Sequence, residues 1–233
     1  MPDDGFVTII QDPGRLFSPD SADFDLGPSG DAEIIVLLAA DDWTPPTQQY
    51  LIDKANAYRL SAITIGGNPH FRWRWFEGAI GSFENFGPTG GVDASHLWVR
   101  LVEDVSASVD LFVSTDPIST AAASVTWGDA VASHAQSVTI DNSTDEIRVG
   151  GGLELLGRFY YLEVLNAPTA GTRQWHLDFR TKDQANWDDL VTGVADGDGN
   201  TWTCNGIKGT DWDYTPETPG GAAGDFAWGL PRG

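Results

Sequence analysis

Residues 146–179 constrain the fold more than any other part of this sequence. Two apolar runs, 146–149 and 157–166, are joined through Gly150–Gly152, and a third run of mixed polar and aromatic residues ends at Phe179. Glycine permits backbone angles that a Cβ forbids, so these glycines predict tight turns between strands. The stretch therefore predicts successive β-strands with short connections.

The run 157–166 further predicts a strand that is covered on both sides. Strict alternation would place one set of its side chains on one face (Arg158, Tyr160, Leu162, Val164) and a second set on the other (Phe159, Tyr161, Glu163, Leu165). Both sets are largely apolar, so neither face is expected to meet water.

Similar runs along the chain predict strands at residues 31–43, 49–54, 57–65, 70–76, 96–104, 109–115, 136–140 and 201–205. Pro45-Pro46 and the cluster 66–69 predict breaks between them. Residues 77–95 are rich in glycine and predict a loop, and residues 118–127 predict a loop or a brief helix. Many short strands without an amphipathic helix indicate an all-β fold of two packed antiparallel sheets.

The ends of the chain differ in composition from its middle. We expect residues 1–30 to form an N-terminal arm or edge strand, residues 31–206 to form the domain, and residues 207–233 to form a C-terminal extension rich in glycine and proline. That extension carries spaced aromatic residues suited to docking on a partner surface, namely Trp212, Tyr214, Phe226 and Trp228.

The charge and the single cysteine exclude several functions. The net charge of −21, from 34 acids and 13 bases, argues against binding to nucleic acid or an anionic membrane, and leaves basic partners and cations open. Cys204 alone allows neither an internal disulfide nor a multi-cysteine zinc site. No signal peptide is recognised at the N-terminus, so synthesis in a cytoplasm is expected, and no apolar run is long enough to span a membrane.

The order of motifs resembles the laminin-G-like jelly-roll domains of bacteriophage virion proteins, in the concanavalin A-like lectin and glucanase superfamily. The matching segments are Ala-Ala-Asp-Asp-Trp at 39–43, Leu-Ile-Asp-Lys at 51–54, Phe-Arg-Trp-Arg-Trp at 71–75, Leu-Trp-Val-Arg-Leu at 97–101, the run 109–116, Gly-Arg-Phe-Tyr-Tyr at 157–161 and the run 198–206. Each segment alone is weak evidence for this resemblance, whereas the order and spacing of the segments over residues 31–206 are more specific to the family.

This resemblance implies a concanavalin A-like jelly roll in a non-enzymatic component of a tailed-phage virion: a tail, tail-tip or fibre protein, or a head decoration. Its expected partners are other virion proteins, further copies of itself and a host cell-wall glycan. It would be made in the host cytoplasm and carried in the virion. A carbohydrate-binding, lectin-like module is the alternative, and a glycan hydrolase with an atypical site is a remote one.

Catalytic motifs are missing from the sequence. Glycosidases of the superfamily carry a Glu-x-Asp-x-(x)-Glu run on one strand, and no such run occurs here. The four histidines have no Gly-x-Ser-x-Gly partner, and a His-Glu-x-x-His run is also missing. We therefore expect no enzymatic activity.

Two binding sites are nevertheless candidates. Trp73 and Trp75 share a strand face with Phe71, which is typical of a core but also fits a platform for sugar rings, as does Trp98. Asp196, Asp198 and Asn200 alternate with glycines and could supply oxygen ligands to Ca²⁺, although no bidentate acid follows. A plain glycine turn is the other interpretation of these three residues.

Overall fold

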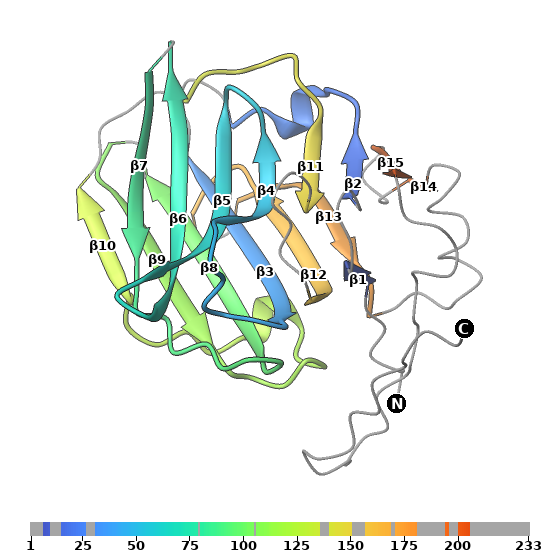
Figure 1. Ribbon diagram of the computed structural model, residues 1–233. Coiled ribbons are helices and arrows are strands. Elements are labelled where there is room, and N and C mark those ends of the chain that lie inside the picture. Colours follow the sequence, from blue (N-terminus) through green and yellow to red (C-terminus); the bar gives the residue numbers. More distant parts are fainter. Residues whose placement is uncertain are drawn as a thin grey trace.

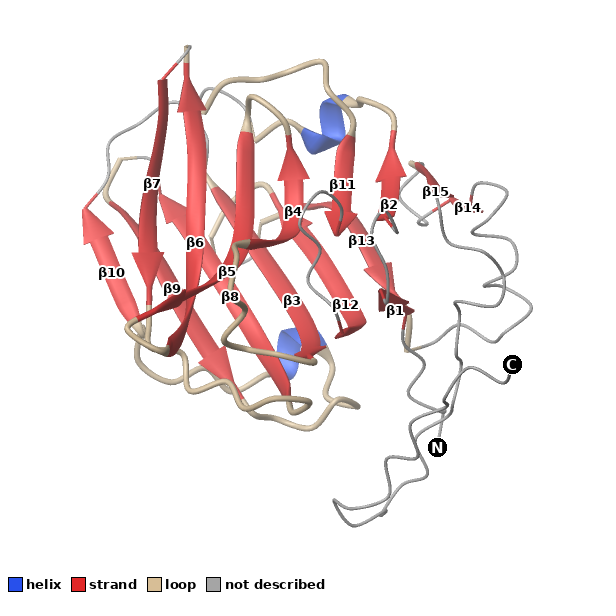
Figure 2. Cartoon of the chain, viewed as in Figure 1, coloured by secondary structure: helices blue, strands red, loops and turns tan. Residues whose placement is uncertain are grey.

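The computed structural model describes residues 7–9, 15–26, 31–78, 80–104, 106–135, 140–150, 157–168, 171–180, 194–195 and 200–205. Within these residues, two antiparallel β-sheets lie face to face (Figure 1), with two short 3-10 turns and no α-helix (Figure 2). The predicted two-sheet antiparallel sandwich is confirmed.

Sheet A has the strand order β1-β12-β3-β8-β9-β10, and β13 pairs with β12 beyond the end of β1. The bounds of its strands are β1 Val7–Ile9, β3 Ala32–Ala40, β8 His96–Asp104, β9 Ser108–Ser114, β10 Ala132–Ala135, β12 Gly157–Leu165 and β13 Arg173–Asp178. Every residue of β3 is buried, because this central strand is covered on both faces.

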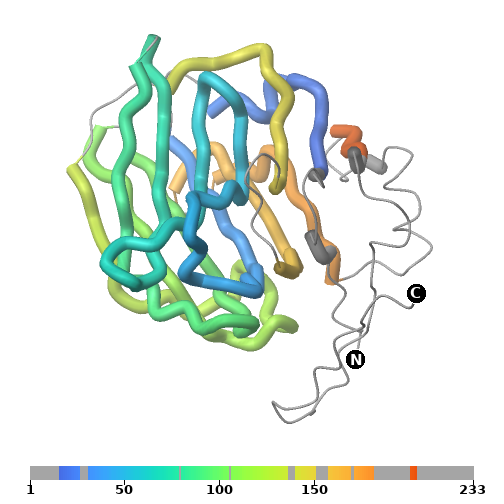
Figure 3. The backbone as a smooth tube through the Cα atoms, in the orientation of Figure 1, coloured from blue at the N-terminus to red at the C-terminus, as the bar shows by residue number. Residues whose placement is uncertain are grey.

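Sheet B has the strand order β14-β15-β2-β11-β4-β5-β6-β7. The bounds are β2 Arg15–Ser18, β4 Gln49–Lys54, β5 Tyr58–Ile65, β6 Asn68–Glu77, β7 Ile80–Phe86, β11 Ile147–Gly150, β14 Val194–Ala195 and β15 Thr201–Asn205. Consecutive strands lie in different sheets after β1, β2, β3, β7, β10, β11 and β13, and Figure 3 traces the path of the backbone. Each sheet therefore combines strands that are distant in sequence.

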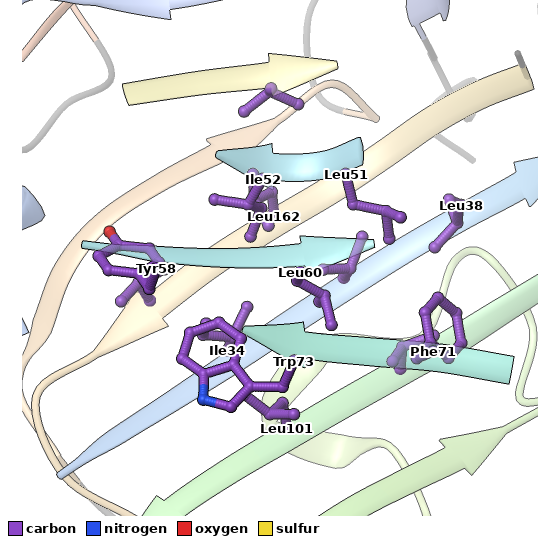
Figure 4. Packing of buried hydrophobic residues seen from close by; sticks show 14 of the residues in the cluster. Ile34, Leu38, Leu51, Ile52, Tyr58, Leu60, Phe71, Trp73, Leu101 and Leu162 are labelled. Atoms are coloured by element: carbon purple, nitrogen blue, oxygen red, sulfur yellow. The ribbon is translucent and has the colours of Figure 1, made fainter. Parts of the chain in front are cut away.

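The core lies between the sheets and is built from alternate residues of facing strands. Figure 4 shows Tyr58, Leu60, Phe71 and Trp73 of sheet B packed over Ile34, Leu38, Leu101 and Leu162 of sheet A. Burial of so many large side chains supplies the main driving force for folding.

One end of the sandwich is closed by the segment 19–26, which contains the 3-10 turn η1 (Ala22–Phe24). Phe24 meets Trp175 and Trp202 edge-on, with 5.6 Å between ring centroids in both pairs. Fully buried Lys54 forms ion pairs with Asp20 and Asp25 of this segment. The N-terminal segment is thus part of the folded domain.

That finding changes the expected N-terminal boundary. Residues 1–30 were expected to form an arm or an edge strand before the domain, but β2 lies inside sheet B between β15 and β11. Only β1 occupies an edge, where it pairs with the first residues of β12. The extension 207–233 lies outside the described residues.

Two further expectations about strands were wrong. Residues 80–86 form β7 rather than a loop. The strand predicted at 136–140 stays a prediction, because 136–139 lie outside the described residues; β10 comes just before it, at 132–135. The alternation predicted for 157–166 also fails, because the pairing of β12 with β3 shifts register between Phe159 and Tyr161. This bulge puts both Tyr160 and Tyr161 on the outer face, whereas Phe159 and Leu162 face the core. Both faces of β12 are nonetheless covered, as predicted.

Candidate functional site: the outer face of sheet B

The three tryptophans predicted as a sugar platform are buried in the structure. Trp73 and Trp98 are fully buried, and 5% of Trp75 is exposed. Trp73 and Trp75 belong to the core between the sheets, and Trp98 packs in a second apolar cluster on the outer side of sheet A. None of the three presents a ring face to solvent, so the prediction that they stack on sugars was wrong.

The calcium and docking predictions fall largely outside the described residues. This holds for Asp196, Asp198, Trp212, Tyr214, Phe226 and Trp228. Asn200 is described and is 6% exposed. Across the described ranges, no cluster of three or more His, Cys, Asp or Glu side chains suits a metal ion. The calcium loop and the docking surface stay predictions.

The outer face of sheet A is covered by the chain itself. Residues 115–131, including the 3-10 turn η2 (Ala122–Ser124), cross this face and place Ile118 and Val125 in an apolar cluster with Leu37, Trp98 and Tyr160. The indole Nε1 of Trp98 donates a hydrogen bond of 3.4 Å to the carbonyl of Pro117. Little of this face is therefore left for a ligand.

Arg180 attaches that loop to sheet A. Its Nη1 donates to the carbonyls of Ile118 (3.1 Å) and Thr120 (2.8 Å), while its Nε and Nη2 both bond to the carboxylate of Asp178 at 2.9 Å. The guanidinium also lies 4.7 Å from the ring centroid of Tyr161. Burial raises the pKa of Tyr161, so its hydroxyl stays protonated at neutral pH. These contacts leave Arg180 with a structural role.

The outer face of sheet B has a different character between β5 and β7. Phe71, Trp73 and Trp75 of β6 face the core, so the alternate residues Arg72, Arg74 and Phe76 face outward. Pairing with β7 brings Asn85 opposite Arg72, Phe83 opposite Arg74, and Gly81 opposite Phe76. We call the set Arg72, Arg74, Phe76, Phe83 and Asn85 the basic–aromatic strip.

Arg72 is held in place by both of its neighbours on β7. Its Nε donates a hydrogen bond of 2.8 Å to Oδ1 of Asn85. Its guanidinium carbon lies 4.3 Å from the ring centroid of Phe83, which is 50% exposed. A guanidinium at this distance stacks favourably on an aromatic ring. The Nη atoms of Arg72 have no hydrogen-bond partner among the described residues.

Arg74 lies across Gly81 and beside Phe76. Its guanidinium carbon is 4.6 Å from the ring centroid of Phe76, and a Cβ built on Gly81 would come within 2.7 Å of its Nη2. The absence of a side chain at Gly81 therefore makes room for the guanidinium. The Nε–H of Arg74 is buried and donates to no acceptor among the described residues. This arrangement explains a glycine inside a strand, where glycine usually weakens pairing.

The strip has no groups for hydrolysis. Its five residues include neither a carboxylate nor a nucleophile, and nearby Asp53 on the same face is bound by Arg59, with 2.7 Å between Oδ1 and Nη2. A glycosidase needs two carboxylates flanking the scissile bond. What the strip does offer is an exposed aromatic ring and two guanidinium groups, which are groups for recognition.

Sequence reasoning placed the candidate binding surface on the same strand, β6, but on its other face. The alternation in 70–76 had separated Arg72 and Arg74 from the aromatic residues, but the binding prediction went to the tryptophans. The β7 half of the strip was missed because the glycines of 77–95 predicted a loop. The available signal was the alternating run from Ile80 to Phe86, which places Phe83 and Asn85 on one face.

In the described part of the chain, no helix is long and apolar enough to cross a membrane.

The sequence matches no protein-family model and no curated protein. The comparisons that succeed are with solved structures. A protein from Bacteroides ovatus, to which carbohydrate binding is provisionally ascribed, matches with a TM-score of 0.60 at 11% identity, over 88% of this chain and 59% of its own. The chain thus spans about three fifths of that protein's length.

Two further matches have lower scores. A heptameric SAP-like pentraxin from Limulus polyphemus matches with a TM-score of 0.47 at 11% identity, over 72% of this chain and 78% of its own. The receptor-binding domain of botulinum neurotoxin C/D mosaic serotype matches with a TM-score of 0.41 at 9% identity, over 70% of this chain and 41% of its own. At such low identity the Bacteroides protein is informative about the fold alone. The chain is an antiparallel jelly-roll sandwich, and its fold is similar to that of the Bacteroides protein.

Proposed function

We propose that this chain is a non-catalytic carbohydrate-recognition domain whose glycan-contacting surface is the basic–aromatic strip. The observation that carries the proposal is the contrast between the outer faces: the chain covers sheet A with its own loop, while the strip on sheet B keeps Phe83 half exposed. A sugar ring has an apolar C–H face that packs on aromatic rings and hydroxyls that accept hydrogen bonds. The strip supplies both complements side by side.

The likeness to the Bacteroides protein supports this proposal at the level of the fold only. The absence of a carboxylate from the strip supports recognition rather than hydrolysis. Polysaccharide cleavage abolished by one Asp or Glu substitution would favour the hydrolase alternative instead.

A glycan array with the full chain tests the proposal, using two variants on the same strand. Phe83→Ala removes the exposed ring of the strip, and Ile80→Ala removes an apolar side chain that is 71% exposed but lies outside it. We expect binding to at least one glycan, weakened severalfold or more by Phe83→Ala and unchanged by Ile80→Ala. Failure to bind any glycan at millimolar concentration, or equal losses in both variants, would contradict the proposal.

We also propose that the domain is carried on the virion of a tailed phage, among other virion proteins and as a homo-oligomer. The motif order over residues 31–206 supports this setting. Immunogold labelling of native particles is the direct test, because an adhesin must be accessible on the particle surface. Limited proteolysis adds a second readout: residues 207–233 should be cleaved in the free protein and protected in the particle. Unlabelled particles would contradict this setting without affecting glycan recognition.

A further inference from the structure

Arg72 and Arg74 differ from the other arginines for which the structure shows a side-chain partner. Arg59, Arg100, Arg148 and Arg180 each bond to a carboxylate at 2.7–2.9 Å, from Asp53, Glu33, Glu146 and Asp178 respectively. Among the described residues, neither Arg72 nor Arg74 forms an ion pair. This is unusual in a chain with 34 acids and 13 bases, where a base is surrounded by acidic alternatives.

The local sequence keeps carboxylates away from this pair. Arg72 faces the neutral amide of Asn85 across the ladder, and Arg74 faces Phe83. Glu84 is adjacent in sequence but pairs with inward-facing Trp73, and its Oε2 lies 3.2 Å from Nδ1 of His134 on β10. The carboxylate next in sequence to Phe83 and Asn85 is therefore directed to the edge between the sheets.

Both guanidinium groups are nevertheless held in defined positions. Phe83 and Asn85 fix Arg72, while Phe76 and the space over Gly81 fix Arg74. The buried and unpaired Nε of Arg74 costs stability, because a half-buried cation that loses water without gaining an acceptor is destabilised. A preorganised pair of this kind binds an anion without first losing side-chain freedom.

We propose that Arg72 and Arg74 bind the carboxylate of an acidic sugar, a uronic acid or a related sugar acid, within a glycan held on the basic–aromatic strip. Residues i and i+2 of a strand lie about 7 Å apart, so both guanidinium forks reach one monosaccharide. A planar fork matches a carboxylate in two parallel hydrogen bonds. The exposed ring of Phe83 lies beside the pair and takes the apolar face of the same or the adjacent sugar.

The net charge narrows the ligand to glycans with isolated acidic residues. A chain of charge −21 repels densely charged polyanions. At physiological ionic strength, salt screens charge–charge interactions over distances beyond about 8 Å. The direct contact between one carboxylate and the guanidinium groups of Arg72 and Arg74 is much shorter, so salt weakens it far less. A glycan with one acid among neutral sugars therefore fits the strip best.

The test rests on the proposed function and compares acidic oligosaccharides with their carboxyl-reduced counterparts. The full chain, the double variant Arg72→Gln/Arg74→Gln and the control Arg148→Gln are titrated with a uronic-acid panel and the reduced panel. Arg148 lies on β11 of the same sheet and already pairs with Glu146 at 2.8 Å. We expect the unmodified chain and Arg148→Gln to bind an acidic glycan at least about tenfold more tightly than its carboxyl-reduced counterpart. The double variant should bind the two glycans with similar affinity.

Gly81→Ala supplies a second variant that leaves the charge unchanged. Its methyl group would occupy the place of the Arg74 guanidinium, so the preference for the acidic glycan should fall while the neutral glycan binds as before. Equal affinity of the unmodified chain for acidic and reduced glycans would overturn the inference and leave glycan recognition standing. Absence of binding to both panels would overturn recognition as well. Self-association lost in the double variant, without an effect on glycans, would identify a second copy as the occupant and overturn the inference.

Discussion

The two outer faces of this sandwich use the same residue type in opposite ways. On sheet A, the guanidinium of Arg180 donates to Asp178 and to two loop carbonyls, and aromatic rings flank it. On sheet B, Arg74 is also stacked on a ring, but it has no acceptor among the described residues. Position and stacking are thus similar for the two arginines, whereas the saturation of their donors differs. That difference is what supports the proposed binding role of Arg74.

The largest expected effect separates the buried face of β6 from the exposed strip that β6 and β7 form. Trp73→Ala removes a fully buried indole from the core and should lower the free energy of unfolding by about 4 kcal/mol. Phe83→Ala removes a half-exposed ring from the neighbouring strand and should cost less than about 1 kcal/mol. Urea denaturation of both variants measures the difference. A small loss for Trp73→Ala would mean that the ring is not core, and would reopen its assignment as a sugar platform.

Next in size is the effect of removing each arginine of the comparison. Arg180→Met removes the guanidinium that bonds both to Asp178 and to the carbonyls of the loop 115–131, so we expect a loss of about 3 kcal/mol. Arg74→Met removes a cation with no acceptor and should change stability by about 0.5 kcal/mol or less in either direction. Thermal and urea unfolding of the two variants would show whether donor saturation predicts the cost. Similar losses would remove the basis for treating Arg74 as a ligand-binding residue.

The sequence alone predicted much of this architecture and little of the binding surface, for identifiable reasons. Strands such as β4 and β8 were located to the residue, because their apolar runs are bounded by clear turn signals. Gly81 misled the prediction, since a glycine placed to make room for Arg74 looks locally like a turn residue. The bulge at Tyr160 depends on pairing with β3, which is far away in the chain. The local pattern of β6 did favour its aromatic face as the core, as the structure confirms, but it could not show which side chains of β7 lie beside Arg72 and Arg74.

The smallest expected effect on stability comes from converting the sheet B arrangement into that of sheet A. Asn85→Asp keeps the shape of the side chain and replaces the amide oxygen that accepts from Nε of Arg72 with a carboxylate oxygen. A partly exposed ion pair of this kind should raise the free energy of unfolding by less than about 1 kcal/mol. The preference for an acidic glycan should nevertheless disappear, because the new negative charge beside Arg72 repels a second carboxylate.

Asn166→Asp is the matched control for that substitution, because it makes the same change of charge. Asn166 lies just after β12 of sheet A, and its Oδ1 accepts a hydrogen bond of 2.9 Å from the backbone of Thr172, a contact that the aspartate retains. Titration with the acidic and reduced glycans should therefore show a lost preference in Asn85→Asp and an intact one in Asn166→Asp. If both variants keep the preference, the guanidinium donors are not what recognises the acid. If both variants lose the preference, the overall charge of the protein rather than the strip decides binding. The difference in donor saturation between Arg180 and Arg74 would then say nothing about ligand binding.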